Sequence, residues 1–190
     1  MRRSVCVYCS SSDRAPQAHF DEARLLGRAI AGRGWTLVFG GADVGVMGAL
    51  ARAVSEAGGR VTGVVPAAIE KKGLAYAQAD ELVVTPDLRS RKERMESLAD
   101  AFIALPGGFG TLEETLEIIT LKQLGLHAKP IALVNTLGFY DGLMGLFERI
   151  YDEHFAKRSF SALFACTAGA EEALAYIDAY RPVPVESKWY

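Results

Sequence analysis

The chain has 190 residues, half of them hydrophobic, and a formal net charge of −2 at pH 7. This length and composition suit one globular domain over residues 1–190, with an irregular, proline-containing tail from about residue 181. The near-neutral charge argues against a nucleic acid polymer or an anionic membrane surface as a partner, and no apolar stretch approaches the roughly 20 residues that span a bilayer.

The first residues, with Arg2 and Arg3 before a short strand-like run, lack the long apolar core of a signal peptide, so we expect a cytoplasmic protein. Cys6 and Cys9 form a C-x-x-C pattern. Side chains three apart on a strand point to opposite faces, so we predict ordinary strand cysteines rather than a redox or zinc pair. No second C-x-x-C or histidine pair completes a metal site, and no metal is expected.

Strands and helices alternate along the chain. The apolar patterns predict strands over residues 4–9, 35–39, 60–65, 81–85, 101–105, 130–134 and 164–167. They predict helices from residue 16 to the glycines near 32–34, and over about 45–57, 87–100, 111 onwards, 139–154 and 169–180. Continuous apolar strands favour a mainly parallel sheet with helices on both faces. The expected fold is a doubly wound, Rossmann-like α/β domain with about seven strands.

Ligands of such sheets lie beyond the carboxyl ends of the strands. Three loops leave these ends at residues 10–12, 40–45 and 106–111, and they can line one crevice. Ser11 and Gly41 are candidate substrate-binding residues in the first two loops.

The stretch from Leu105 to Glu114, L-P-G-G-F-G-T-L-E-E, follows a predicted strand and precedes a predicted helix that begins near Thr111. Its glycines, Gly107, Gly108 and Gly110, let successive backbone N–H groups converge, and the helix dipole adds a positive field. The stretch therefore predicts a cradle for a phosphate or carboxylate.

The second glycine turn, G-G-A-D-V-G over residues 40–45, only approximates a dinucleotide fingerprint. Ala42 adds a side chain where a pyrophosphate should approach most closely, and the strand ending near Val65 carries no acid for a ribose. Two interpretations stay open: a tight packing turn, and one wall of a mononucleotide pocket. No G-K-[ST] sequence occurs, so a Walker A ATPase is excluded.

Thr111 and Glu114 have the spacing of a capping box, which would tie Glu114 to the backbone at Thr111. The alternative is catalysis, because a carboxylate one turn from an anion cradle is better suited to a cationic transition state than to the bound anion. We favour catalysis for Glu114.

The segment from Arg89 to Arg94 is strongly cationic, and Arg89 and Arg94 fit a solvated face. Arg91 differs because its spacing places it on the stripe with Leu88, Met95 and Leu98 that should face the sheet. A buried guanidinium needs a carboxylate or phosphate partner, so Arg91 is a candidate functional residue.

Residues 106–114 resemble the P-G-G-x-G-T-x-x-E signature of the LONELY GUY family, often labelled lysine decarboxylase-like, and Arg91-Lys92 matches its R-K pair. The similarity runs from about residue 4 to residue 155. Further matches lie at Val7-Tyr8-Cys9, Val44 to Gly48, Gly63 to Pro66, Gln123 to Gly125 and Lys129-Pro130. Ser10, Ala42 and Leu88 depart from the family pattern, which leaves the preferred base open.

The resemblance implies a phosphoribohydrolase that releases the base and ribose 5-phosphate from N6-modified AMP or AMP, without a cofactor and as a homodimer. The decarboxylase label lacks support, because that reaction needs pyridoxal phosphate on a lysine and the signature contains none. A rival interpretation is a carrier that binds a nucleotide or molybdenum cofactor without chemistry. The implied catalytic residues are Arg91 and Glu114; the implied substrate-binding residues are Ser11, Gly41, Lys92, Gly107, Gly108, Gly110, Thr111 and Thr120.

Overall fold

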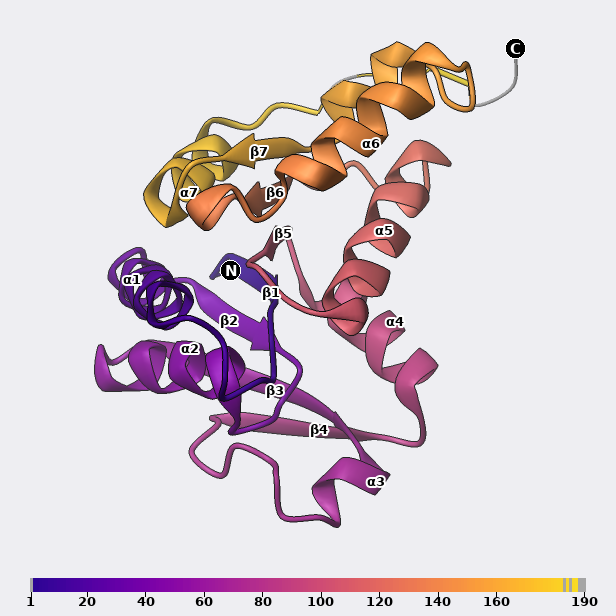
Figure 1. Cartoon of the computed structure of the whole chain (residues 1–190). Coiled ribbons are helices and arrows are strands. Elements are labelled where there is room, and N and C mark those ends of the chain that lie inside the picture. The colour runs from indigo at the N-terminus through magenta and orange to yellow at the C-terminus, as the bar shows by residue number, and fades with distance from the viewer. Residues whose placement is uncertain (1, 183, 185, 188–190) are drawn as a thin grey trace.

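The computed structural model describes residues 2–182, 184, 186 and 187, and its centre is a seven-stranded sheet (Figure 1). The strand order is β4-β3-β2-β1-β5-β6-β7, and every pair of neighbouring named strands is parallel. The strands are β1 (Ser4–Tyr8), β2 (Thr36–Phe39), β3 (Arg60–Pro66), β4 (Glu81–Thr85), β5 (Ala101–Ala104), β6 (Ile131–Val134) and β7 (Ala165–Thr167). This arrangement confirms the predicted doubly wound fold.

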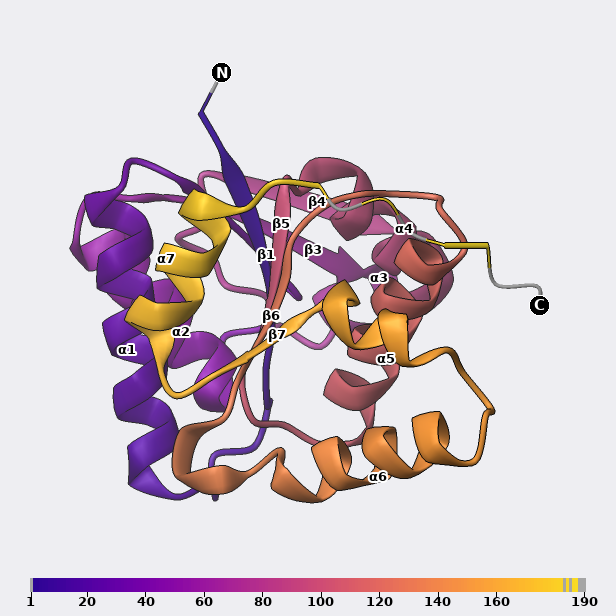
Figure 2. The same ribbon diagram turned by 90° about the horizontal axis from the view of Figure 1, so that it is seen from above.

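Helices cover both faces of the sheet, as Figure 2 shows. One face carries α1 (Gln17–Gly32), α2 (Gly45–Glu56) and α7 (Ala170–Ala179), and the other carries α4 (Leu88–Leu98) and α5 (Phe109–Gln123). The remaining elements are α3 (Ala67–Glu70), α6 (Asp141–Asp152) and the 3-10 turns η1 (Thr136–Gly138) and η2 (Arg158–Leu163). None of these helices, within the described part of the chain, is long and apolar enough to cross a membrane.

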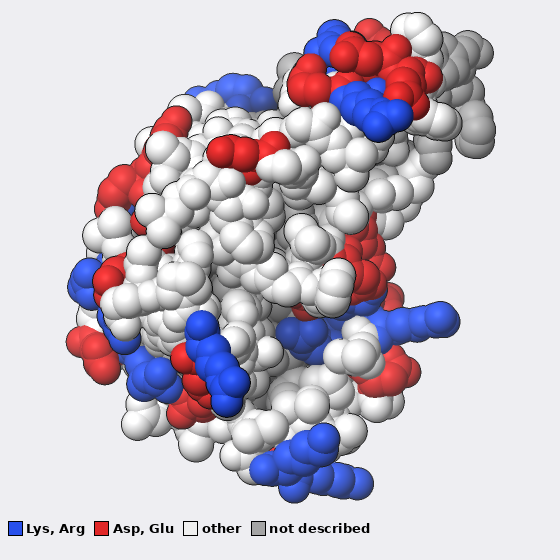
Figure 3. Space-filling view, viewed as in Figure 1, with Lys and Arg blue, Asp and Glu red and all other residues white. Residues whose placement is uncertain are grey.

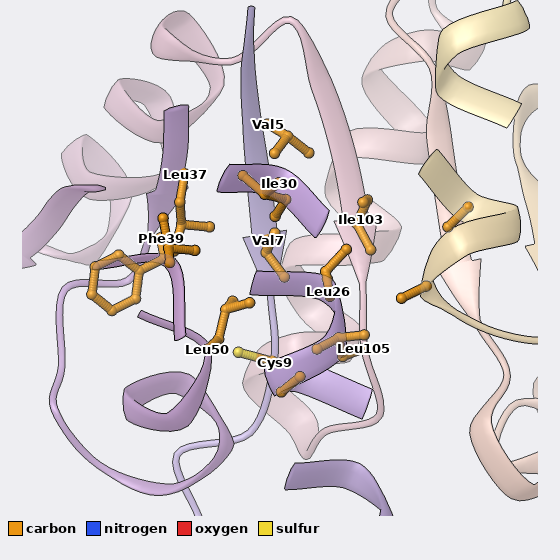
Figure 4. Packing of buried hydrophobic residues seen from close by; sticks show 14 of the residues in the cluster. Val5, Val7, Cys9, Leu26, Ile30, Leu37, Phe39, Leu50, Ile103 and Leu105 are labelled. Atoms are coloured by element: carbon orange, nitrogen blue, oxygen red, sulfur yellow. The ribbon is translucent and has the colours of Figure 1, made fainter. Parts of the chain in front are cut away.

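The core fills the space between the sheet and α1 and α2, where aliphatic side chains such as Val7, Leu26 and Leu50 interlock (Figure 4). Cys9 belongs to this cluster, whereas Cys6 belongs to the cluster under α4 and α5. The two buried thiols therefore lie on opposite faces of the sheet, as their spacing predicted, and both are free.

The sequence placed every strand end within one residue, but it misplaced some helices. It missed α3 and both 3-10 turns, and it predicted one helix over residues 139–154 where η1 precedes a shorter α6. The described tail residues, Arg181, Pro182, Pro184, Glu186 and Ser187, form no helix or strand. The rest of the predicted irregular tail lies outside the described residues.

The chain reverses its direction of winding between β1 and β5. From β1 the sheet grows through β2, β3 and β4 to one edge, and β5, β6 and β7 extend it to the other. The loops after β1 and β5 therefore diverge at their carboxyl ends, which is where doubly wound sheets open a crevice for ligands.

Candidate active site

A pocket of about 470 Å³ opens at the carboxyl ends of the strands. Segments that follow β1, β2, β3 and β5, together with α4, contribute to its walls. The described lining residues are Cys9, Ser10, Ser11, Ser12, Gly40, Ala42, Met47, Pro66, Ile69, Leu88, Arg91, Gly108, Phe109, Gly110, Thr111 and Glu114. Figure 3 shows the hollow beside α4 and α5, with Lys and Arg side chains gathered in it.

The glycine turn after β5 leads directly into α5. This helix begins at Phe109 with Gly108 as its N-cap, so it starts two residues before the predicted position at Thr111. The N–H groups of the first turn have no acceptor within the helix, and they lie at the positive end of the helix dipole. At Gly107, any side chain would collide with the side chain of Thr111. The backbone N–H groups of this turn are therefore not covered by a side chain at position 107, as an anion-binding turn requires.

Glu114 forms a buried ion pair with Arg91. The Arg91 Nη1 donates to Glu114 Oε1 at 2.7 Å, and the two side chains are only 11% and 9% exposed. Arg91 Nε donates to the carbonyl oxygen of Val64 at 3.1 Å, which fixes the guanidinium against the end of β3. The pair confirms that Arg91 is buried with a carboxylate partner.

The capping-box interpretation of Glu114 is wrong. Thr111 lies inside the first turn of α5 rather than at its cap, and the Glu114 carboxylate is directed to Arg91 on another helix. Burial raises the pKa of Glu114 above its ordinary value, and the neighbouring Arg91 charge opposes that rise. A carboxylate with a raised pKa that faces a pocket is a recurrent feature of catalytic sites.

The loop after β2 contributes in two ways, because part of it packs tightly and part of it lines the pocket. Gly40 and Ala42 line the pocket. Gly41, at φ 75°, packs against the backbone of Val64 instead and is absent from the described lining. A side chain at Gly40 would collide with the Arg91 guanidinium, so this glycine makes room for the cation.

The loop after β1 brings Ser11 to the pocket. Gly45, at φ 58°, touches the Ser11 backbone so closely that no side chain fits between them. The N–H of Gly45 donates to Asp13 Oδ1 at 2.8 Å. These contacts join the first two loops and fix the position of Ser11.

Lys92 lies behind the pocket rather than in its wall. Its ammonium pairs with Glu113 and with Glu117, the latter at 2.9 Å, both on α5. Burial lowers the pKa of Lys92, but the hydrogen bonds to the two carboxylates outweigh this effect and the net direction is upward. The lysine therefore holds α4 against α5.

Thr120 lies outside the pocket. It is exposed on α5, and its Oγ1 donates to the carbonyl oxygen of Leu116 at 2.7 Å. It follows Thr111 by nine residues, or about 13 Å along a helix axis. Six of the predicted site residues line the pocket together: Ser11, Arg91, Gly108, Gly110, Thr111 and Glu114. Three others, Gly41, Lys92 and Gly107, lie behind the lining and pack against it. Thr120 is not among the described lining residues.

Several lining residues escaped the sequence analysis. Leu88 was expected to face the sheet, but as the first residue of α4 it is 61% exposed and lies at the pocket. Phe109 is 93% exposed at the start of α5, and Ile69 comes from α3, a helix that the sequence analysis missed. The sequence could have indicated Phe109 as a pocket residue, because it is an aromatic residue between two glycines at the end of a strand, and residues in such loops often contact ligands.

Within the described residues, no group of three His, Cys, Asp or Glu side chains could hold a metal ion. The groups that line the pocket include a carboxylate, a guanidinium, hydroxyl groups and backbone donors. Such a set suits an anionic substrate whose reaction develops positive charge beside Glu114.

Comparisons with known proteins identify the family of the chain. Residues 47–177 match a family model described as "Possible lysine decarboxylase". Cytokinin riboside 5'-monophosphate phosphoribohydrolase LOG5 of Arabidopsis thaliana is 38% identical over 191 residues, covering 98% of this chain and 84% of the relative. The probable phosphoribohydrolase LOGL1 of Oryza sativa subsp. japonica is 40% identical over 176 residues, covering 93% and 79%.

Solved structures share the fold at lower identity. A molybdenum cofactor binding protein from Rippkaea orientalis superposes with a TM-score of 0.72 at 22% identity, covering 94% of this chain and 97% of that chain. The molybdenum cofactor carrier protein of Chlamydomonas reinhardtii gives 0.73 with the same identity and coverage. These likenesses establish the fold alone. The sequence matches, which span nearly the whole chain, show that it belongs to the LOG family, whose family model carries the description "Possible lysine decarboxylase".

Proposed function

We propose that this protein hydrolyses the N-glycosidic bond of a nucleoside 5'-monophosphate, releasing the free base and ribose 5-phosphate, and that its substrate is a cytokinin riboside 5'-monophosphate or AMP. The observation that carries the proposal is the buried Arg91–Glu114 pair beside a glycine turn at the start of a helix, in one pocket. The names of the relatives, which act on cytokinin riboside 5'-monophosphates, support the same reaction.

The 5'-phosphate would bind at the start of α5. Backbone N–H groups of Gly108, Gly110 and Thr111, with the helix dipole, match a phosphate dianion. Ser11 lines the same pocket from the opposite loop, and its hydroxyl would donate to the phosphate. This position leaves the sugar near Glu114, one turn further along the helix.

The reaction breaks the bond between ribose C1' and a base nitrogen, and the bonding electrons leave with the base. Positive charge then develops on the ribose ring, and the Glu114 carboxylate stabilises it. Water adds to C1', while its proton passes to Glu114 and finally to the departing base. Arg91 keeps Glu114 ionised and oriented, and it offers its remaining donors to the substrate.

The apolar part of the pocket would receive the base. Met47, Ile69, Leu88 and Phe109 all line it, and an N6-modified adenine carries a large apolar surface. Lys92 would stabilise the site by holding α4 and α5 together. Gly41 and Gly107 would keep the two turns in their conformations.

We also propose a homodimer. Leu116, Leu146 and Phe139 are exposed apolar residues on or beside α5 and α6, which is typical of an association surface. Thr120 lies on the outside of α5, so it would reach substrate only in a neighbouring subunit. Sedimentation analysis with a Leu146→Asp variant tests the dimer: a wild type that sediments as a monomer contradicts it.

The free cysteines suit a reducing compartment such as the cytosol.

The direct test is incubation with isopentenyladenine riboside 5'-monophosphate, AMP and adenosine, followed by chromatography for free base. The proposal expects base and ribose 5-phosphate from a monophosphate and much less from adenosine, which lacks the phosphate. Glu114→Gln under the same conditions controls for contaminating hydrolases. Stoichiometric retention of intact nucleotide without free base would instead identify a carrier.

A further inference from the structure

Lys122 is the most unusual side chain outside the active-site pocket. It lies in the last turn of α5 and is only 1% exposed, which places it among the largest fully buried side chains. Its Nζ is buried and has no hydrogen-bond partner among the described residues. An ammonium group carries three donors, and a buried charge without an acceptor is destabilising.

A second cavity, of about 350 Å³, adjoins this lysine. Its described lining comes from Lys122, from η2 and from the tail, namely Ser159, Phe160, Ser161, Ala162, Leu163, Pro184 and Glu186. It shares no described lining residue with the active-site pocket, which lies at the other end of α5. The two cavities are therefore separate sites.

The surroundings of Lys122 only partly compensate its charge. Its Nζ lies 4.7 Å from the ring centroid of Tyr180, a cation–π contact that supplies no hydrogen-bond acceptor. The Glu186 carboxylate at the same cavity accepts a hydrogen bond from Ser159 at 3.3 Å and lies 4.0 Å from Lys157. Burial lowers the pKa of Lys122 to about 8, so the amine is still mostly protonated at pH 7.

The cavity walls define the ligand that would complete this site. Among the described lining residues, Phe160, Ala162, Leu163 and Pro184 are apolar, whereas the polar side chains carry one ammonium, two serine hydroxyls and one carboxylate. A phosphate dianion would bring two negative charges to a site whose described lining has one cation, Lys122, because Lys157 already pairs with Glu186. A monocarboxylate brings one charge and can carry an apolar body to fill the remaining space.

We propose that this cavity binds a small organic monocarboxylate with a compact apolar body. One carboxylate oxygen accepts from the Lys122 ammonium, and the Ser161 hydroxyl donates to the other, while Ser159 keeps its hydrogen bond to Glu186. The apolar body packs against Phe160 and Leu163. Because α5 joins this cavity to the active-site pocket, the ligand stabilises the helix that carries Glu114.

The test uses benzoate as the probe and benzamide as its uncharged analogue, in calorimetric titrations of the full chain. The expected result is saturable benzoate binding, with benzamide at least about tenfold weaker, which corresponds to a difference of about 1.4 kcal/mol. Lys122→Met retains the length and removes the charge, and it should weaken benzoate binding by a similar factor. Equal binding of benzoate and benzamide, or the absence of benzoate binding to the wild type, overturns the proposal.

Lys129→Met is the matched control. Lys129 is also partly buried and also lies over a ring, that of Phe102, but its Nζ donates to the carbonyl oxygen of Glu96 at 2.8 Å. This variant should bind benzoate as the wild type does. An Arg91→Ala variant should do the same, since a loss of binding there would locate benzoate in the active-site pocket and overturn the proposal.

A second measurement keeps the proposal testable if Lys122→Met does not fold. The pKa of the Lys122 amine can be followed by NMR through its Cε resonance in the wild type. Saturating benzoate should raise that pKa, because a bound anion favours the charged amine. An unchanged pKa at saturation contradicts the proposed contact.

Discussion

The Arg91 guanidinium lies directly against the α-carbon of Gly40, in the space that a side chain at position 40 would occupy. Gly40 is the first residue after β2, and Arg91 reaches it from α4, so the cation lies over the end of the sheet where it meets Glu114. The position of the proposed catalytic pair thus depends on the absence of a side chain 51 residues earlier in the sequence.

Gly40→Ala should therefore lower activity without unfolding the protein. The added methyl group meets the flexible end of Arg91, which can move away, and the displaced guanidinium no longer orients Glu114. A misplacement of about 1 Å can cost roughly 10²-fold in rate. Steady-state kinetics and a thermal melt check this result. Gly32→Ala is the control, because a methyl group there meets nothing within 4 Å. Full activity in Gly40→Ala would contradict the proposal that activity depends on the exact position of the Arg91 guanidinium.

Glu114→Gln should abolish hydrolysis while AMP still binds. The amide keeps the shape of the side chain but neither stabilises a cationic ribose nor accepts a proton, and the loss should reach at least about 10²- to 10⁴-fold. Turnover assays and calorimetric titration with AMP separate the two effects. Glu113→Gln is the matched control, because Glu113 is exposed and faces Lys92 instead of the pocket. Near-normal turnover in Glu114→Gln would remove Glu114 from the mechanism.

Arg91→Ala should weaken activity by about 10²- to 10³-fold, the usual effect of removing an electrostatic contact at a reacting centre. The fold should survive, because Glu114 can take up a proton when its partner is absent. Arg94→Ala on the exposed face of α4 controls for the loss of a cation from the same helix. A large fall in melting temperature in Arg91→Ala would instead identify a structural ion pair.

Activity should fall on the acid side with an apparent pKa above the ordinary glutamate value of 4.5. The proposed mechanism needs an ionised Glu114, and burial raises the pKa of this side chain. Protonation should therefore abolish activity at a higher pH than it would if Glu114 were exposed to solvent. The pH profile of kcat/KM measures this pKa in the free enzyme. In Arg91→Ala the acid limb should move to still higher pH, because the charge that lowers the pKa is gone. An unchanged limb would show that another group titrates.

The sequence predicted the fold and the pocket in some detail. Apolar runs placed the strands, and glycine turns after β2 and β5 indicated which loops meet. The spacing of Arg91 predicted a buried guanidinium. The sequence could not identify Glu114 as the partner of Arg91, because their contact depends on how α4 and α5 pack on the sheet.

The errors of the sequence analysis have physical causes. Glycines are poor helix formers, so the helix was expected at Thr111, yet the free backbone of Gly108 and Gly110 allowed it to begin at Phe109. Lys122 went unnoticed because a lysine near the end of a helix is ordinarily solvated. Its burial depends on tertiary packing, since η2, the Tyr180 ring and the described tail residues lie around it.

Every described residue that lines the active-site pocket comes from positions 9–114, whereas the elements from β6 onwards contribute none. Variation in the last third of the chain therefore leaves the described lining of this pocket unchanged. For an engineer, this part of the protein is the natural place to install a sensor or a regulatory module. Changes in base preference should instead be sought in α3, in the first residue of α4 and at the start of α5.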